Sequence, residues 1–311
     1  MREHRRGEGS GKSERASLYQ DVTDRIIAEL EQGRVPWVQP WGAAKATLSL
    51  PRNAATARRY SGVNILVLWG AVIERGFPAQ HWLTFRQALQ LGGNVRKGER
   101  GTTVFYADQF IPKEERARAE EERSEPAAVP FLKRFTVFNV AQCDGLPAHF
   151  FAAAPAVPER EIIPRAESLI AATGADFRIG GARAYYVPAA DFIQVPPQPA
   201  FFDQINYYRT SFHELGHWTG HASRLNRDLR NARGSKLYAR EELVAEMASA
   251  FLCASLAIVP TVRHTDYLGS WLDVLREDNR AIFRAASAAS KAADFILAFE
   301  NGASAERGAA P

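Results

Sequence analysis

The residues best placed to do chemistry form the pentapeptide His213-Glu214-Leu215-Gly216-His217. Side chains four positions apart lie on one face of a helix, so His213 and His217 can present their imidazoles to one metal ion. Glu214 is offset from that pair and can take a proton from an attacking water as a general base. The spacing therefore predicts a zinc-dependent peptidase centre with one Zn²⁺ per chain, although other divalent transition metals suit the same donors. A buried helix with two unrelated histidines is the structural alternative.

A third ligand must come from another helix, and residues 238–252 are the best source. Glu242 and Glu246 lie one turn apart on one face of this segment. Glu246 is followed by small and apolar residues, so it faces inward, where a carboxylate needs a cation or a donor. We predict Glu246 as the ligand and Glu242 as the residue that orients a histidine, with an exchange of the two roles left open. Glu241 suits a solvated face.

His221 lies four residues beyond His217 and needs a separate interpretation. Along an unbroken helix it would be about 12 Å from His213, whereas ligands of one ion lie about 2 Å from it. We therefore place His221 beside the site or in the substrate cleft, with a structural role as the alternative. In a competing hypothesis the zinc is purely structural and is closed by a fourth side chain such as His221 or an aspartate.

Basic residues are concentrated in the first half of the chain. Residues 1–150 hold 22 Lys and Arg against 17 Asp and Glu, and the remainder holds 17 against 18. Arginines can follow a phosphate backbone while neighbouring aromatic rings stack on unpaired bases, so single-stranded DNA is the favoured partner. No helix-turn-helix or zinc-finger pattern predicts base-specific readout. The candidate contact residues are Arg58, Arg59 and Tyr60 in one cluster and Arg96, Lys97 and Arg100 in a second.

Hydrophobic periodicity and turn residues predict the elements that position these groups. The expected elements of the first half are a helix over 18–30, a buried helix at 65–70, a helix at 86–91 capped by Thr84, and partner strands at 102–106 and 131–140. The charged segment 112–126 is interpreted as a solvated insertion between these strands. In the second half, a helix near 164–173 and a strand pair around 177–187 precede the two helices of the metal site.

A length of 311 residues favours two domains. The predicted boundaries are a disordered basic tail at 1–15, a domain at 16–148, a linker at 149–163, a domain at 164–300 and a disordered tail at 301–311. The chain shows no secretory signal and no apolar run of about 20 residues, so no membrane association is expected. Its two cysteines, Cys143 and Cys253, are far apart, which favours a reduced, cytoplasmic setting.

Six segments of the chain carry a family resemblance. They are residues 60–64, 82–106 and 138–143 in the first half, and 213–228, 238–252 and 267–295 in the second. In these segments the chain resembles the ArdC-like antirestriction proteins of conjugative plasmids and related regions of TraC-type plasmid primases. The resemblance implies an α+β fold, in which an N-terminal α/β domain that binds single-stranded DNA precedes a mainly helical, zincin-like metallopeptidase domain with a small sheet.

The same resemblance implies a role in shielding plasmid DNA against host restriction during conjugation, with an unknown protein or peptide as the peptidase substrate. The alternative function is a non-catalytic protector of single-stranded DNA, or a primase accessory protein, with a structural zinc site. A nuclease-like activity is less favoured, because no acidic cluster suited to two magnesium ions is visible.

Overall fold

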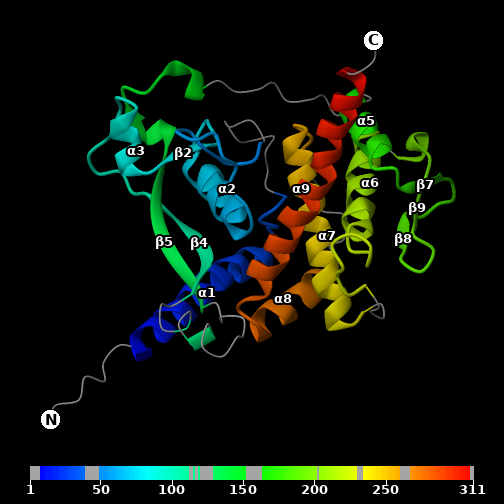
Figure 1. The fold of residues 1–311 in the computed structure, drawn as a ribbon, viewed down its shortest axis with the longest axis horizontal. Helices are drawn as coiled ribbons and strands as arrows, with labels where there is room; N and C mark the ends of the chain where they lie inside the picture. Colours follow the sequence, from blue (N-terminus) through cyan, green and yellow to red (C-terminus); the bar gives the residue numbers. More distant parts are fainter. Residues whose placement is uncertain are drawn as a thin grey trace.

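A layer of helices lies between two small regions of β-structure (Figure 1). The structure is a computed structural model that describes residues 8–38, 49–111, 115, 118–119, 129–151, 163–201, 203–229, 234–259 and 267–308. The chain therefore has the mixed α and β composition that the sequence predicted. None of the described helices combines the length and the apolar character that crossing a membrane requires.

The N-terminal part contains a four-stranded sheet of order β1-β2-β5-β4 and a two-stranded sheet of β3 and β6. Its elements are α1 (Glu8–Glu31), β1 (Arg52–Asn53), α2 (Val63–Arg75), β2 (His81–Leu83), α3 (Phe85–Gln90), β3 (Asn94–Val95), β4 (Thr102–Phe110), β5 (Val129–Asn139), η1 (Val140–Gln142), β6 (Cys143–Asp144) and η2 (Ala148–Phe151). The long strands β4 and β5 pair antiparallel, which confirms the predicted partner strands. Most of the charged insertion 112–126 lies outside the described residues.

Local side-chain bonds explain where the N-terminal helices begin and what they hold. Thr84 caps α3 by accepting from the backbone N–H of Gln87 at 3.3 Å, and the Gln87 side chain accepts in return from the Thr84 N–H at 3.0 Å. Asn64 in α2 donates to the carbonyl of Phe105 at 2.7 Å and accepts from its N–H at 2.8 Å. The side chain of Asn64 thus fixes α2 against β4.

The C-terminal part is mainly helical, with a three-stranded sheet of order β7-β9-β8. Its elements are α5 (Pro164–Ala172), β7 (Asp176–Ile179), β8 (Tyr185–Val187), β9 (Phe192–Val195), η3 (Gln198–Ala200), α6 (Ile205–Trp218), α7 (Lys236–Ser255), α8 (Leu268–Glu277) and α9 (Ala281–Gly308). The expected strand pair around 177–187 was incomplete, because β9 lies between β7 and β8 and pairs with both. A turn that includes Asp191, with a φ of 49°, returns the chain to form this central strand.

Both helices at the ends of the chain are longer than the sequence predicted. Helix α1 begins at Glu8, so residues 8–15 are helical where a disordered tail was expected. Helix α9 continues to Gly308, which places residues 301–308 in a helix as well. Both segments are rich in glycine and serine, which favoured a tail, but a helix that is already nucleated extends at a low cost per residue.

Side chains of the N-terminal and C-terminal parts pack into one continuous core. The rings of Trp37 and Trp271 lie 5.4 Å apart between centroids, and those of Trp69 and Phe251 lie 5.8 Å apart. In Figure 1, α9 runs between the N-terminal part and the helices that carry the metal-site motif. Most of the predicted linker 149–163 lies outside the described residues.

Candidate metal centre and basic groove

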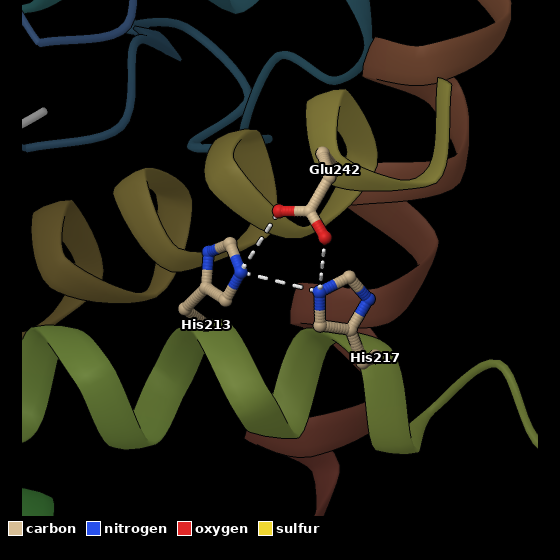
Figure 2. A group of neighbouring side chains, drawn as sticks. All are labelled: His213, His217 and Glu242. Atoms are coloured by element: carbon tan, nitrogen blue, oxygen red, sulfur yellow. Dashed lines mark hydrogen bonds and ion pairs between the residues drawn. The ribbon is translucent and has the colours of Figure 1, made fainter. Parts of the chain in front are cut away.

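The two motif histidines lie on α6 and face a carboxylate on α7 (Figure 2). Nε2 of His213 lies 3.2 Å from Nε2 of His217. Each of these nitrogens lies 3.5 Å from one carboxylate oxygen of Glu242. Within the described part of the chain, these three residues form the group whose donor atoms converge as metal ligands would.

The spacing of these donors fits a small divalent ion. Two ligands bound at about 2.0–2.1 Å to a tetrahedral Zn²⁺ lie about 3.3–3.4 Å from each other. The two histidine nitrogens are 3.2 Å apart, each is 3.5 Å from a different oxygen of Glu242, and one donor atom from each of the three residues lies within 4.8 Å of the others. Two imidazole nitrogens and one carboxylate oxygen are also the donor types of open zinc sites. His213, His217 and Glu242 are therefore a candidate site for one divalent metal ion.

Glu246 lies on the other side of His213, which differs from the ligand role that the sequence predicted. Its Oε1 is 3.5 Å from Nδ1 of His213, the nitrogen that points away from the group. The structure favours the exchange of roles, with Glu242 as ligand and Glu246 as the residue that orients a histidine. Both carboxylates share one helical face, so the sequence could not show which turn of α7 lies level with the imidazoles.

Glu241 holds the outer nitrogen of the second histidine. Its Oε1 lies 3.2 Å from Nδ1 of His217, and Arg227 donates to both of its oxygens at 2.8 and 3.0 Å. The expectation of a solvated Glu241 was wrong, because only 10% of its side chain is exposed. Sequence reasoning missed Arg227, which belongs to another segment of the chain and whose guanidinium compensates the negative charge of the buried Glu241.

Gly216 explains how α7 comes so close to the imidazoles. A Cβ atom at this position would lie 3.2 Å from Cα of Ala245, closer than most side-chain contacts. Ala245 is followed by Glu246 and preceded by the two other glutamates of the site. The glycine between the motif residues thus allows the helix backbones to approach until the carboxylates reach the histidines.

A cavity of about 270 Å³ lies beside the three donor residues. Its lining includes Glu214, which is 6% exposed, and Tyr185 and Tyr186 of β8, which is an edge strand. His221 does not line this cavity. Helix α6 ends at Trp218, and Nδ1 of His221 lies 2.8 Å from the Ser223 hydroxyl, which indicates a local structural role.

The charges of the site are strongly coupled. Burial alone would raise the pKa of Glu242, but hydrogen bonds from His213 and His217 hold that pKa far below its usual range. Burial would lower the pKa of His217, but hydrogen bonds to Glu241 and Glu242 raise it. The pKa of the Tyr238 hydroxyl at the cavity wall is raised, mainly by burial and to a smaller extent by a hydrogen bond to Glu242. The site therefore keeps the carboxylate charge that a cation requires.

The first predicted nucleic-acid cluster lines a separate hollow, which we call the basic groove. Arg58, Arg59 and Tyr60 form part of its wall together with Tyr106 and Phe135. The rings of Tyr106 and Phe135 are 49% and 46% exposed, and their centroids lie 6.4 Å apart. Sequence reasoning missed Phe135, because one aromatic residue in a strand is usually part of the core.

The second predicted cluster is not part of the basic groove. Arg96 donates to Glu99 at 2.7 Å and to the carbonyl of Ala141 at 2.7 Å, so its guanidinium connects its own turn to η1. Lys97 and Arg100 do not line the groove either. The structure therefore brings together only Arg58, Arg59 and Tyr60 of the six predicted contact residues.

Family models match both parts of the chain. The fold and the site define a zincin-like protein, and residues 164–288 match the model for a zincin-like metallopeptidase. Residues 16–138 match the model for the N-terminal domain of anti-restriction factor ArdC.

The similarity to relatives and to solved structures covers almost the whole chain. Uncharacterized protein y4eC of Sinorhizobium fredii is 42% identical over 289 residues, or 92% of this chain and 93% of y4eC. Two DNA primases TraC of Escherichia coli are 38% identical over 302 residues, which cover 91% of this chain but only 27% and 20% of the primases.

The antirestriction ArdC protein from the R388 plasmid is 40% identical, and two of its crystal structures resemble this fold. The metal-free form has a TM-score of 0.78 and covers 92% of this chain and 98% of ArdC. The Mn(II)-bound form has a TM-score of 0.75 and covers 91% and 97%. The chain belongs to the ArdC family of antirestriction proteins.

Proposed function

We propose that this chain binds single-stranded DNA, carries a zinc-dependent peptidase centre, and protects incoming plasmid DNA during conjugation. Family membership supports the antirestriction role, and the relation to the TraC primases supports contact with DNA. The basic groove, with two arginines beside exposed rings, supports the preference for single strands. The reduced cysteines fit the cytoplasmic location that we propose for this activity.

The convergence of His213, His217 and Glu242 at the edge of a cavity carries the peptidase proposal. A zinc ion held there would polarise a peptide carbonyl and lower the pKa of water. Glu214 lines the same cavity and would accept the proton from the attacking water on its carboxylate. The edge strand β8 would bind the substrate by pairing with its extended backbone.

A purely structural zinc is less well supported than a catalytic one. Structural sites are closed by four protein ligands. Among the described residues the donor group has three members. A cavity, and no fourth donor side chain of that group, lies beside them. The open side of the site is also the side that Glu214 and β8 face.

The peptidase proposal predicts a specific effect of Glu214→Gln. The variant should retain one zinc per chain by elemental analysis, because Glu214 is not in the donor group. Its cleavage of a random peptide library, followed by mass spectrometry, should fall by at least about a hundredfold, the usual effect of losing a general base. Cleavage at the wild-type rate would remove Glu214 from the mechanism, and absence of cleavage by the zinc-loaded wild type would contradict peptidase activity on these peptides.

The DNA-binding proposal predicts a salt-sensitive affinity for single strands. We expect the Kd of the full chain for a fluorescein-labelled oligo(dT) to rise steeply between about 50 and 200 mM salt, because bound arginines release counterions. Fluorescence anisotropy measures this dependence. A Kd that is equal at both salt concentrations would exclude phosphate contacts as the basis of binding.

A further inference from the structure

The basic groove adjoins a second hollow on the C-terminal part. The two hollows have volumes of about 700 and 900 Å³, and both are lined by Tyr19, Phe283 and Ser287. The backbone N–H of Gly62, next to the basic cluster, donates to the hydroxyl of Ser290 on α9 at 2.8 Å. The two hollows are therefore neighbours across a fixed contact between α9 and the N-terminal part.

The second hollow has an exposed basic wall. Arg280, just before α9, and Arg284 and Lys291 within it line the hollow, and all three are exposed. Their positions, with Ser287 between them, recur at helical spacing and so share one face of α9. Arg284 is paired with Asp278, but Arg280 and Lys291 form no ion pair with a carboxylate of the described residues. Two cationic side chains of this face are thus available to an anion.

Aromatic rings mark the junction of the hollows. Tyr19 and Phe283 lie 4.7 Å apart between ring centroids, and the guanidinium carbon of Arg280 lies 5.0 Å from the centre of the Tyr19 ring. Phe105 of β4 lies 5.9 Å from Phe283 and connects this cluster to the sheet. The combination of aromatic rings and nearby cationic side chains therefore continues from the basic groove onto α9. Rings can stack on the bases of a single strand, and the cations can bind its phosphates.

We propose that the surface for single-stranded DNA crosses from the N-terminal part onto α9, so that the zincin-like part contacts the strand directly. Arg280 and Lys291 bind phosphates, in continuation of Arg58 and Arg59. This inference rests on the proposed binding of single-stranded DNA and adds the second half of its path. The path ends at Arg227, which lines the second hollow and also holds Glu241 at the metal centre.

The test compares two double variants of equal charge. Arg280→Gln with Lys291→Gln removes the two free cations of α9. Arg34→Gln with Arg183→Gln removes two exposed cations that line neither hollow and form no ion pair with described residues. The Kd for oligo(dT) is measured with the zinc-loaded full chain by anisotropy over about 50–200 mM salt.

Loss of two phosphate contacts should make the log–log salt dependence shallower by about 1.4 for the α9 variant and weaken binding several-fold at low salt. The control variant should retain the wild-type slope, and both should retain the wild-type Tm, because all four positions are exposed. Equal slopes for the α9 variant and the wild type would overturn the inference, as would an equal loss in the control.

A third variant separates this inference from the proposed function. If Arg58→Gln with Arg59→Gln weakens binding while the α9 variant does not, only the extension onto α9 fails. If the wild type does not bind oligo(dT), DNA binding itself fails. If a duplex of equal length binds as tightly and depends equally on Arg280 and Lys291, the assignment to single strands is overturned.

Discussion

At the residue scale, both nitrogens of each imidazole in the site face a carboxylate. Nε2 of His213 and of His217 faces Glu242, while the outer nitrogens face Glu246 and Glu241. Carboxylates in this outer position fix the ring orientation and the tautomer of a metal-binding histidine. Three carboxylates from one helix therefore lie against two histidines, and the position of each along and around α7 decides which imidazole nitrogen it faces.

This geometry predicts different costs for two otherwise similar substitutions. Glu242→Gln and Glu246→Gln alter equally buried residues of the same helix, each 3% exposed. Loss of an orienting carboxylate should weaken zinc binding by about 10–100-fold, and loss of the ligand should weaken it further. Competition with a chelator of known affinity measures both constants. If Glu246→Gln were the more damaging change, the ligand role would return to Glu246.

At the element scale, the crossing of α6 and α7 decides whether the donors meet. The backbones lie close at Gly216, where a Cβ would be 3.2 Å from Cα of Ala245, and one turn before the motif the hydroxyl of Ser249 donates to the carbonyl of Arg209 at 2.9 Å. Small side chains at both points keep the two backbones near each other. The geometry of the site therefore depends on residues that contribute no metal-binding atom.

Gly216→Ala should consequently impair metal binding without removing a ligand. The added methyl group forces the helices apart by a few tenths of an ångström, and overpacking of this kind costs about 1–3 kcal/mol. We expect at least a tenfold weaker zinc affinity and a lower Tm. The matched control is Gly70→Ala in α2, where a Cβ would meet only the Arg25 side chain at an ordinary 3.5 Å. The control should raise stability by about 0.5–1 kcal/mol; equal zinc affinity in Gly216→Ala and the wild type would contradict the role of the crossing.

The elements that sequence predicted best are those with local signals. Thr84 lies where a cap was expected, and the apolar run at 65–70 lies within the buried helix α2. The short strand β9 was missed, because four residues give too few alternations to separate a strand from a loop. The sequence also could not predict which of Glu242 and Glu246 lies level with the histidines. This depends on how α6 and α7 contact each other, which the periodicity within one helix does not encode.

At the scale of the whole molecule, the two parts of the chain complete one core. Trp37 and Trp69 of the N-terminal part are fully buried against Trp271 and Phe251 of the C-terminal part. The sequence predicted two domains joined by a linker, which would allow each to fold separately. A large apolar side chain that becomes exposed loses about 1.5–3 kcal/mol of burial free energy. The net free energy of unfolding of a domain is only about 5–15 kcal/mol.

We therefore predict that the full chain unfolds in a single calorimetric transition. A fragment of residues 8–151 should lack a cooperative transition and should bind a hydrophobic dye, because its tryptophans are uncovered. Differential scanning calorimetry and dye fluorescence measure these properties. Two separate transitions of the full chain, or cooperative melting of the fragment, would show that the parts fold independently.

The shared core also limits how this protein can be rearranged in evolution. A recombination event between the two parts would leave each half with an uncovered tryptophan, so the smallest segment that can be transplanted intact is the joined pair. The TraC primases agree with this constraint: the stretch in which each resembles this chain corresponds to 91% of it, although it makes up 27% or 20% of the primase. A new protein that acquires the N-terminal part in this fold therefore also needs the C-terminal helices that cover its tryptophans.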